Sequence, residues 1–269
     1  MRTLYVSDLD GTLLRSDQRL SPFTIDALNR LIGQGMLFSY ATARSYVTAR
    51  QVTAGITPAI PIIVYNGAWT LENGTGRVLN RHGFTDEEAR DIFDTLIAHD
   101  IWPIVYAMVD GRECFSYCPE RFNYATREFA ETRRGDPRNR QTDENHLCDG
   151  EVFYFTCIDA PDKLLPLYER YRDRFQCVYS KDIYSGEQWL ELMPRQATKA
   201  RAMLELKERL RCDRVVCFGD GKNDLSLFAA ADESYAVANA VEELKQAATA
   251  VIGGNDEDGV ARWLMENAQ

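Results

Sequence analysis

The fold is decided by one stretch near the N-terminus, Leu4-Tyr5-Val6-Ser7-Asp8-Leu9-Asp10-Gly11-Thr12-Leu13-Leu14. Its apolar beginning predicts a buried strand that stops at Asp8. Ligands of parallel α/β sheets bind at the carboxyl ends of the strands, so we expect Asp8 to lie in a crevice. On extended backbone the side chain of Asp10 would face the same way, and two adjacent carboxylates repel each other unless a cation lies between them. The stretch therefore predicts a strand-end site for Mg²⁺.

Two other interpretations of this loop are available. A calcium-binding loop also contains Asp-x-Asp-Gly, but it requires a Glu at the twelfth position counted from Asp8, where this chain has Arg19. A plain surface turn is the second alternative. Gly11 permits a sharp turn and the hydroxyl of Thr12 can hold its shape, so the loop alone leaves the surface turn open.

The composition limits the class of protein. The chain has 269 residues, 45% of them hydrophobic, which favours well-packed domains. A net charge of −10 and a pI near 4.9 disfavour nucleic acid and anionic membrane as partners. No apolar run or signal-peptide pattern stands out, and the seven cysteines contain no Cys-x-x-Cys pair, so we expect a soluble cytoplasmic protein. A small phosphorylated metabolite could still bind where a metal ion makes a pocket locally positive.

Two more predicted strands end in small polar residues. The strand from Met36 to Ala41 is followed by Thr42, whose hydroxyl could bind a phosphate oxygen together with amides at the start of the next helix. A simple helix cap is the alternative role for Thr42. The strand from Pro61 to Tyr65 ends at Asn66, a second candidate phosphate ligand. Strand ends that share this character suggest one parallel sheet with a common crevice.

The composition changes after residue 81. A capping box at Thr85-Asp86-Glu87-Glu88 opens a helix, and Asp110-Gly111 marks a hairpin. We interpret residues 82–188 as an inserted α+β cap domain. Residues 1–81 and 189–269 then form a discontinuous α/β core with a Rossmann-like, doubly wound parallel sheet. Candidate specificity residues in the insert are Trp102, Arg112, Tyr117 and the polar segment 133–150.

A second acidic cluster follows the strand predicted for residues 214–218. The cluster, Gly219-Asp220-Gly221-Lys222-Asn223-Asp224, fits neither a dinucleotide fingerprint nor a P-loop, because Asp224 takes the third glycine position and Asn223 follows Lys222. Its carboxylates suit Mg²⁺. Lys199 lies in the first turn of a predicted helix, where a lysine is electrostatically disfavoured unless an anion compensates. An ordinary surface lysine is the alternative.

These segments resemble, in order and spacing, the four motifs of the haloacid-dehalogenase superfamily of phosphotransferases. The position and α+β content of the insert are similar to the Cof-like subfamily with its type IIB cap. The second motif departs slightly, since Ala43 replaces the usual glycine. The resemblance implies a Mg²⁺-dependent phosphatase, that is, a phosphoric monoester hydrolase, acting on a small phosphorylated metabolite, with sugar phosphates the first choice and a monomer or small homo-oligomer as its state.

The resemblance also implies residue roles. Asp8 would be the nucleophile that forms an aspartyl phosphate, and Asp10 the general acid and base. Thr42, Lys199, Asn223 and Asn66 would bind phosphate. The metal residues would be Asp8, Asp10 through its backbone carbonyl, Asp220 and Asp224, the last more as an orienting group than as a ligand.

Three alternatives remain at this point. A sugar phosphomutase of the same superfamily would share every motif. A dehalogenase is disfavoured, because the resemblance implies that such relatives lack a carboxylate at the position of Asp10. A non-catalytic metabolite-binding protein would have little use for both Asp8 and Asp10, and turnover would exclude it.

Overall fold

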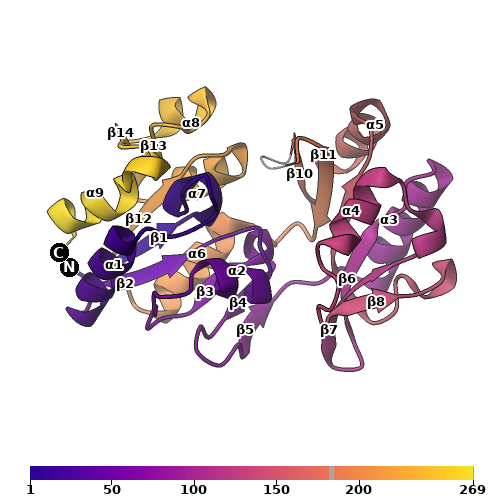
Figure 1. Cartoon of the computed structure of the whole chain (residues 1–269), viewed down its shortest axis with the longest axis horizontal. Helices are drawn as coiled ribbons and strands as arrows, with labels where there is room; N and C mark the ends of the chain where they lie inside the picture. Colours follow the sequence, from indigo (N-terminus) through magenta and orange to yellow (C-terminus); the bar gives the residue numbers. More distant parts are fainter. Residues whose placement is uncertain (182–184, 269) are drawn as a thin grey trace. The chain divides into compact units, whose positions relative to one another are not determined.

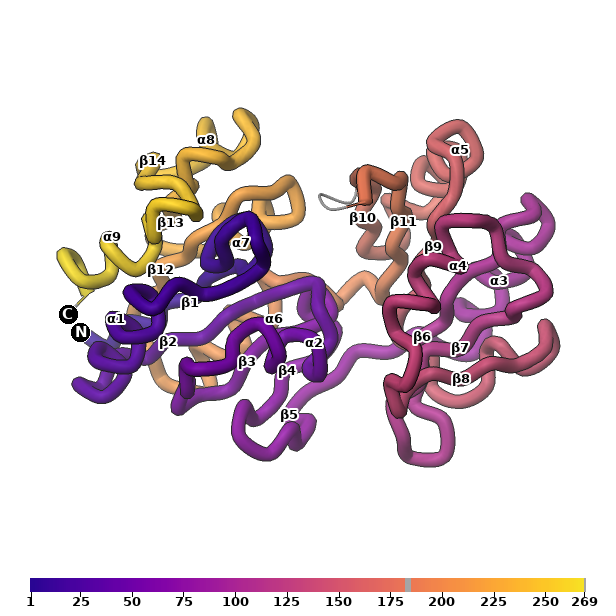
Figure 2. Tube along the Cα trace, in the orientation of Figure 1, coloured from indigo at the N-terminus to yellow at the C-terminus, as the bar shows by residue number. Residues whose placement is uncertain are grey.

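The computed structural model describes residues 1–181 and 185–268. The chain divides into two compact units, the first formed by Met1–Arg81 with Ala197–Gln269 and the second by His82–Gln196 (Figures 1 and 2). The sequence placed the second boundary at 188/189. It lies later because strand β11 (Gln188–Met193) pairs with two strands of the second unit, which draws residues 189–196 into that unit.

The first unit is built on a parallel sheet with strand order β14-β13-β12-β1-β2 in the described residues. Strand β1 lies between β12 and β2, so Tyr5 is paired with Val216 on one side and Phe38 on the other. The predicted parallel α/β sheet is therefore confirmed. Its strands are β1 (Thr3–Ser7), β2 (Leu37–Tyr40), β12 (Arg214–Gly219), β13 (Glu233–Val237) and β14 (Ala250–Ile252).

Helices cover both faces of this sheet. The crossovers from β1 to β2 and from β12 to β13 run in opposite directions along the sheet, and right-handed connections then place their helices on opposite faces. Accordingly α1 packs against α9 and α6 packs against α7. The helices are α1 (Pro22–Gly33), α2 (Tyr46–Val52), α6 (Lys199–Arg209), α7 (Leu225–Ala230), α8 (Glu242–Ala247) and α9 (Gly259–Asn267).

Local sequence explains where the first helix begins. The Ser21 hydroxyl accepts a hydrogen bond from the Thr24 amide at 2.9 Å, and Pro22 occupies the first turn of the helix, where a proline is favoured. The buried residues of α1 include Ala27 and Leu28. In the described part of the chain, none of the helices has both the length and the apolar character needed to cross a lipid bilayer.

The third predicted strand was expected to lie in the parallel sheet, but it pairs mainly with other strands. Strand β3 (Ile62–Val64) pairs in antiparallel fashion with β4 (Trp69–Leu71), which pairs with β5 (Val78–Arg81). It meets the parallel sheet through an isolated bridge between Ala41 and Ile63. One reason is Pro61, which has no amide proton, while its carbonyl accepts a hydrogen bond from the Ser39 side chain at 2.8 Å.

The second unit carries a mostly antiparallel sheet with strand order β10-β11-β9-β6-β7-β8 in the described residues. Its core includes Ile92, Phe155, Leu164 and Leu190. The capping box predicted at Thr85 and Glu88 is present. The elements are α3 (Asp86–Ala98), β6 (Ile104–Val109), β7 (Arg112–Tyr117), α4 (Tyr124–Glu131), β8 (Asn139–Gln141), β9 (Glu151–Ile158), α5 (Pro161–Tyr171), β10 (Gln176–Lys181) and β11.

The polar segment 133–150 contains regular structure. It contains β8, and buried Arg138 forms ion pairs of 2.6 Å with both Glu113 and Asp136. Tyr117 is also buried, and its hydroxyl donates to Asn139 at 2.9 Å. These contacts give Tyr117 and Arg138 structural roles within the second unit.

Candidate active site

Asp8 lies at the carboxyl end of β1, as predicted. Its amide donates to the Phe218 carbonyl of β12 at 2.9 Å, and its side chain is buried. The chain then turns tightly through Leu9–Leu13, with Gly11 in the left-handed region at φ 75°. A Cβ on Gly11 would overlap the Asp220 carboxylate. A glycine is therefore needed here both for the turn and for the close approach of the two acidic loops.

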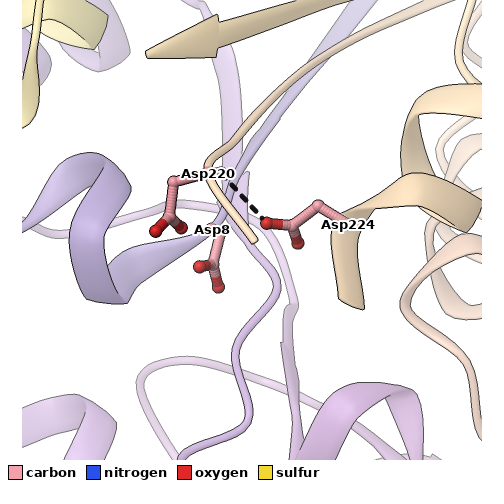
Figure 3. A group of neighbouring side chains, drawn as sticks. All are labelled: Asp8, Asp220 and Asp224. Carbon is pink, nitrogen blue, oxygen red and sulfur yellow. Dashed lines mark hydrogen bonds between the residues drawn. The ribbon is translucent and has the colours of Figure 1, made fainter. Parts of the chain in front are cut away.

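The second acidic cluster closes on the same place. The Thr12 hydroxyl donates to Asp220 Oδ1 at 2.9 Å, which ties the two loops together. The amides of Asp220 and Gly221 both donate to Asp224 Oδ2 at 3.2 Å. Asp8, Asp220 and Asp224 each bring a carboxylate oxygen within 4.8 Å of the others (Figure 3). The structure thus joins three of the four predicted carboxylates into one group.

Lys199 completes this group. It is the first residue of α6, and its Nζ donates to Asp8 Oδ1 at 2.7 Å and to Asp224 Oδ1 at 2.8 Å. Its side chain is 1% exposed, so the interpretation of Lys199 as a surface lysine is wrong. Burial lowers the pKa of Lys199, but the charges of Asp224 and Asp8 outweigh that effect and raise it. Lys199 is therefore a fixed cation.

One lysine does not balance three carboxylates. Burial, reinforced by the charges of Asp224 and Asp220, raises the pKa of Asp8 well above its ordinary value despite Lys199. Burial and the charge of Asp224 raise the pKa of Asp220 to about 6. Burial is the larger cause of both shifts and the neighbouring carboxylates add to it, so a cation bound at this group would favour the charged form of both side chains.

Asp10 lies differently from the sequence expectation. Its carboxylate accepts two hydrogen bonds from Arg44, from Nε at 2.7 Å and from Nη2 at 2.5 Å. Among the described residues, the acidic group with metal-binding spacing does not include it. The rule that alternate side chains face one way applies to a regular strand, whereas β1 ends at Ser7 and the chain turns through Leu9–Leu13. Arg44 was missed as a site residue although it follows Thr42 by only two positions.

The remaining predicted residues lie on neighbouring loops. Thr42 is buried, its Oγ1 accepts from the Arg44 amide at 3.1 Å, and its carbonyl accepts from the Asn66 amide at 2.9 Å. Asn66 is buried and has left-handed backbone at φ 52°. Asn223 is half-buried in the short turn Lys222–Asp224, next to Asp224. The backbone thus couples Thr42 to Asn66, while Asn223 belongs to the acidic loop.

Gly67 lies close to the backbone at the start of α6, which carries Lys199. It has φ 99°, and a Cβ at this position would overlap the carbonyl of Thr198, the residue that caps α6. We expect Gly67→Ala to lower the free energy of unfolding by at least about 2 kcal/mol, because both the backbone conformation and the close approach oppose a side chain. Urea denaturation measures this change.

Gly74→Ala is the matched control. Gly74 lies in the neighbouring connection between β4 and β5, without a positive φ and with open space where the added methyl group would lie, so its unfolding curve should overlay that of the parent protein. If the two variants were equally stable, the close approach of Gly67 to Thr198 would not require a glycine.

The chain is similar to known proteins over nearly its whole length. The chain is 27% identical to the 5-amino-6-(5-phospho-D-ribitylamino)uracil phosphatase YwtE of Bacillus subtilis, over 96% of this chain and 95% of that protein. The crystal structure of TM0651 from Thermotoga maritima matches with a TM-score of 0.79 and 25% identity, covering 100% of this chain and 98% of that one. The subclass IIB sugar phosphatase BT4131 of the same superfamily has the same fold, with a TM-score of 0.77, 20% identity and coverage of 99% and 98%.

The similarity to a named phosphatase runs over nearly the whole chain and indicates an enzyme of the phosphoric monoester hydrolase class. Residues 5–264 match the family model for haloacid dehalogenase-like hydrolases, and the chain belongs to that family. The resemblance stated from the four motifs, including its Cof-like form, is confirmed.

Proposed function

We propose that this protein is a Mg²⁺-dependent phosphatase that hydrolyses small phosphorylated metabolites through an aspartyl phosphate on Asp8. The observation that carries the proposal is Lys199, a buried cation bonded to both Asp8 and Asp224. Phosphoryl transfer depends on positioning a nucleophile and neutralising the charge on the phosphoryl oxygens. A carboxylate at a strand end with a fixed lysine beside it meets both needs.

The steps follow from the residues. An Asp8 oxygen attacks phosphorus in line, the bond from phosphorus to the leaving oxygen breaks, and Asp10 gives that oxygen a proton. Asp10 then takes a proton from water, which attacks the same phosphorus, so that phosphate leaves and the Asp8 carboxylate is restored. Thr42, Lys199, Asn66 and Asn223 are the proposed ligands of the remaining phosphate oxygens.

The donor set suits magnesium. Mg²⁺ prefers hard oxygen ligands and is usually held by few protein side chains, and carboxylate oxygens of Asp8 and Asp220 lie within 4.8 Å of each other. We assign these two side chains and the Asp10 carbonyl to the ion. Both oxygens of Asp224 are already engaged, by Lys199 and by two amides, so Asp224 orients the site instead. When bound, the ion supplies charge neutralisation between carboxylate and phosphate.

Asp220→Ala should weaken the use of magnesium. It deletes one of two assigned carboxylate ligands, so we expect the half-saturating Mg²⁺ concentration to rise at least about tenfold. In the parent protein the same concentration should rise as the pH falls below about 6, because protons then compete for the Asp220 carboxylate. A magnesium titration of activity at several pH values measures both effects. An Asp220→Ala titration that overlays the parent would place the metal site elsewhere.

Sugar phosphates are the proposed substrate class. The relative YwtE is named for a phosphorylated ribityl compound, which is a phosphate ester on a polyol chain. The second unit, the predicted cap, is the proposed source of contacts to the part of the substrate beyond the phosphate. Turnover of a phosphometabolite panel tests the class, and product analysis with a sugar monophosphate separates hydrolysis from the phosphomutase alternative. The cytoplasm remains the predicted compartment.

A further inference from the structure

The side chain of Arg44 forms a fork around Asp10. Its Nε donates to Asp10 Oδ2 at 2.7 Å and its Nη2 donates to Asp10 Oδ1 at 2.5 Å, so each carboxylate oxygen accepts one bond. The same Nη2 donates to the Gln18 side-chain carbonyl at 2.8 Å. The paired side chains are largely shielded, with 18% of Arg44 and 23% of Asp10 exposed. Two parallel bonds of this kind fix the plane of a carboxylate as well as its position.

Arg44 is itself held firmly. Its amide donates to Thr42 Oγ1 at 3.1 Å, and its carbonyl accepts from the Tyr65 amide at 3.0 Å. The partner Gln18 lies in a tight turn with left-handed backbone at φ 62°, closed by a 2.8 Å bond from its amide to the Arg15 carbonyl. The backbone of Arg44 is therefore fixed by two hydrogen bonds, and its guanidinium is held by Gln18 from a separate loop. An exposed ion pair lacks such contacts.

We propose that Arg44 is a positioning residue that orients the Asp10 carboxyl group for proton transfer, an inference that rests on the proposed function. A free carboxyl group rotates broadly about its terminal torsion, whereas the fork leaves one orientation. In the first half-reaction the electron pair of the breaking bond goes to the leaving oxygen, and the proton on Asp10 goes to the same atom. A proton donor that is misplaced by about 1 Å loses much of its contribution.

The dependence of rate on the leaving group isolates this role. The ratio kcat/KM reports steps up to departure of the leaving group, and p-nitrophenolate leaves without a proton whereas an alkoxide requires one. We expect Arg44→Lys and Arg44→Gln to lower kcat/KM for a sugar phosphate by about 10- to 100-fold and for p-nitrophenyl phosphate by less than about threefold. Lysine keeps the charge but lacks the planar fork, so its failure to rescue would point to orientation.

The control is Arg77→Gln, which removes another forked pair, with Glu72, from an exposed hairpin. Its leaving-group dependence should equal that of the parent, and circular dichroism should show all variants folded. If kcat/KM of the Arg44 variants falls equally for both substrates, and the fall comes from a higher KM, the inference is overturned and Arg44 is a substrate ligand. An unchanged slope of log kcat/KM against leaving-group pKa would also overturn it. If the parent protein hydrolyses no phosphate ester, the proposed function fails, and this inference fails with it.

Discussion

Replacing Asp8 by asparagine should reduce phosphate release by at least about a thousandfold, because the amide cannot attack phosphorus and no aspartyl phosphate can form. The protein should remain folded. Asparagine has the same shape, Lys199 keeps its 2.8 Å bond to Asp224, and one of three crowded carboxylates loses its charge. Steady-state phosphate release, together with thermal unfolding, measures both halves of this expectation.

Asp213→Asn is the control for this experiment. Asp213 is an acidic residue that accepts a hydrogen bond from the Arg2 amide at 2.7 Å, at the start of β1 and away from the acidic group, and its loss should leave turnover unchanged. Acid quenching of the parent reaction should trap phosphorylated protein, whereas the Asp8→Asn variant should give none. Turnover by Asp8→Asn at the parent rate would remove Asp8 from the nucleophile role.

Replacing Lys199 by methionine should cost both activity and stability. Methionine fills the space but leaves Asp8 and Asp224 without their shared cation, and breaking a buried ion pair in this way typically costs about 3–5 kcal/mol. Activity should fall by at least about a hundredfold, because the phosphoryl oxygens lose a fixed positive charge. Urea denaturation and phosphate release are the two measurements.

Lys222→Met is the matched control, since this lysine lies on the acidic loop that carries Asp220 and Asp224 and its side chain is 72% exposed. It should change neither quantity appreciably. A double variant, Lys199→Met with Asp8→Asn, should be more stable than Lys199→Met alone, because it removes one of the uncompensated charges. If Lys199→Met were as stable as the parent protein, the ion pairs of Lys199 with the two carboxylates would make no net contribution to the free energy of unfolding.

The acidic site was predictable because each of its charged residues stands out within a short segment of the sequence. A strand that stops at Asp8, a second that stops at Asp220, and a lysine at an unfavourable helix position all predict one charged crevice without knowledge of distant contacts. The helix caps at Ser21 and Thr85 were predictable for the same reason, since a cap is specified within four residues.

The features that the sequence did not predict depend on contacts between segments that are far apart in the chain. The orientation of Asp10 is set by Arg44, 34 residues away, and by a turn whose geometry the alternation rule does not describe. The pairing of β11 with β9 decided a domain boundary that composition alone placed eight residues earlier in the chain, at 188 instead of 196. Propensity and periodicity carry no information on such pairings.

The central position of β1 has a consequence for synthesis. Because β1 pairs with β12 as well as β2, strand β1 cannot be fully paired until residues 214–219 have been synthesised. Thr12 and Asp220, which bond across the two acidic loops, are 208 residues apart, a delay of roughly 10–40 s at ordinary ribosomal rates. The second unit is one continuous segment, so it can fold on the ribosome while the first still waits. Chains truncated between residues 197 and 213 should therefore contain a folded insert but lack a working site.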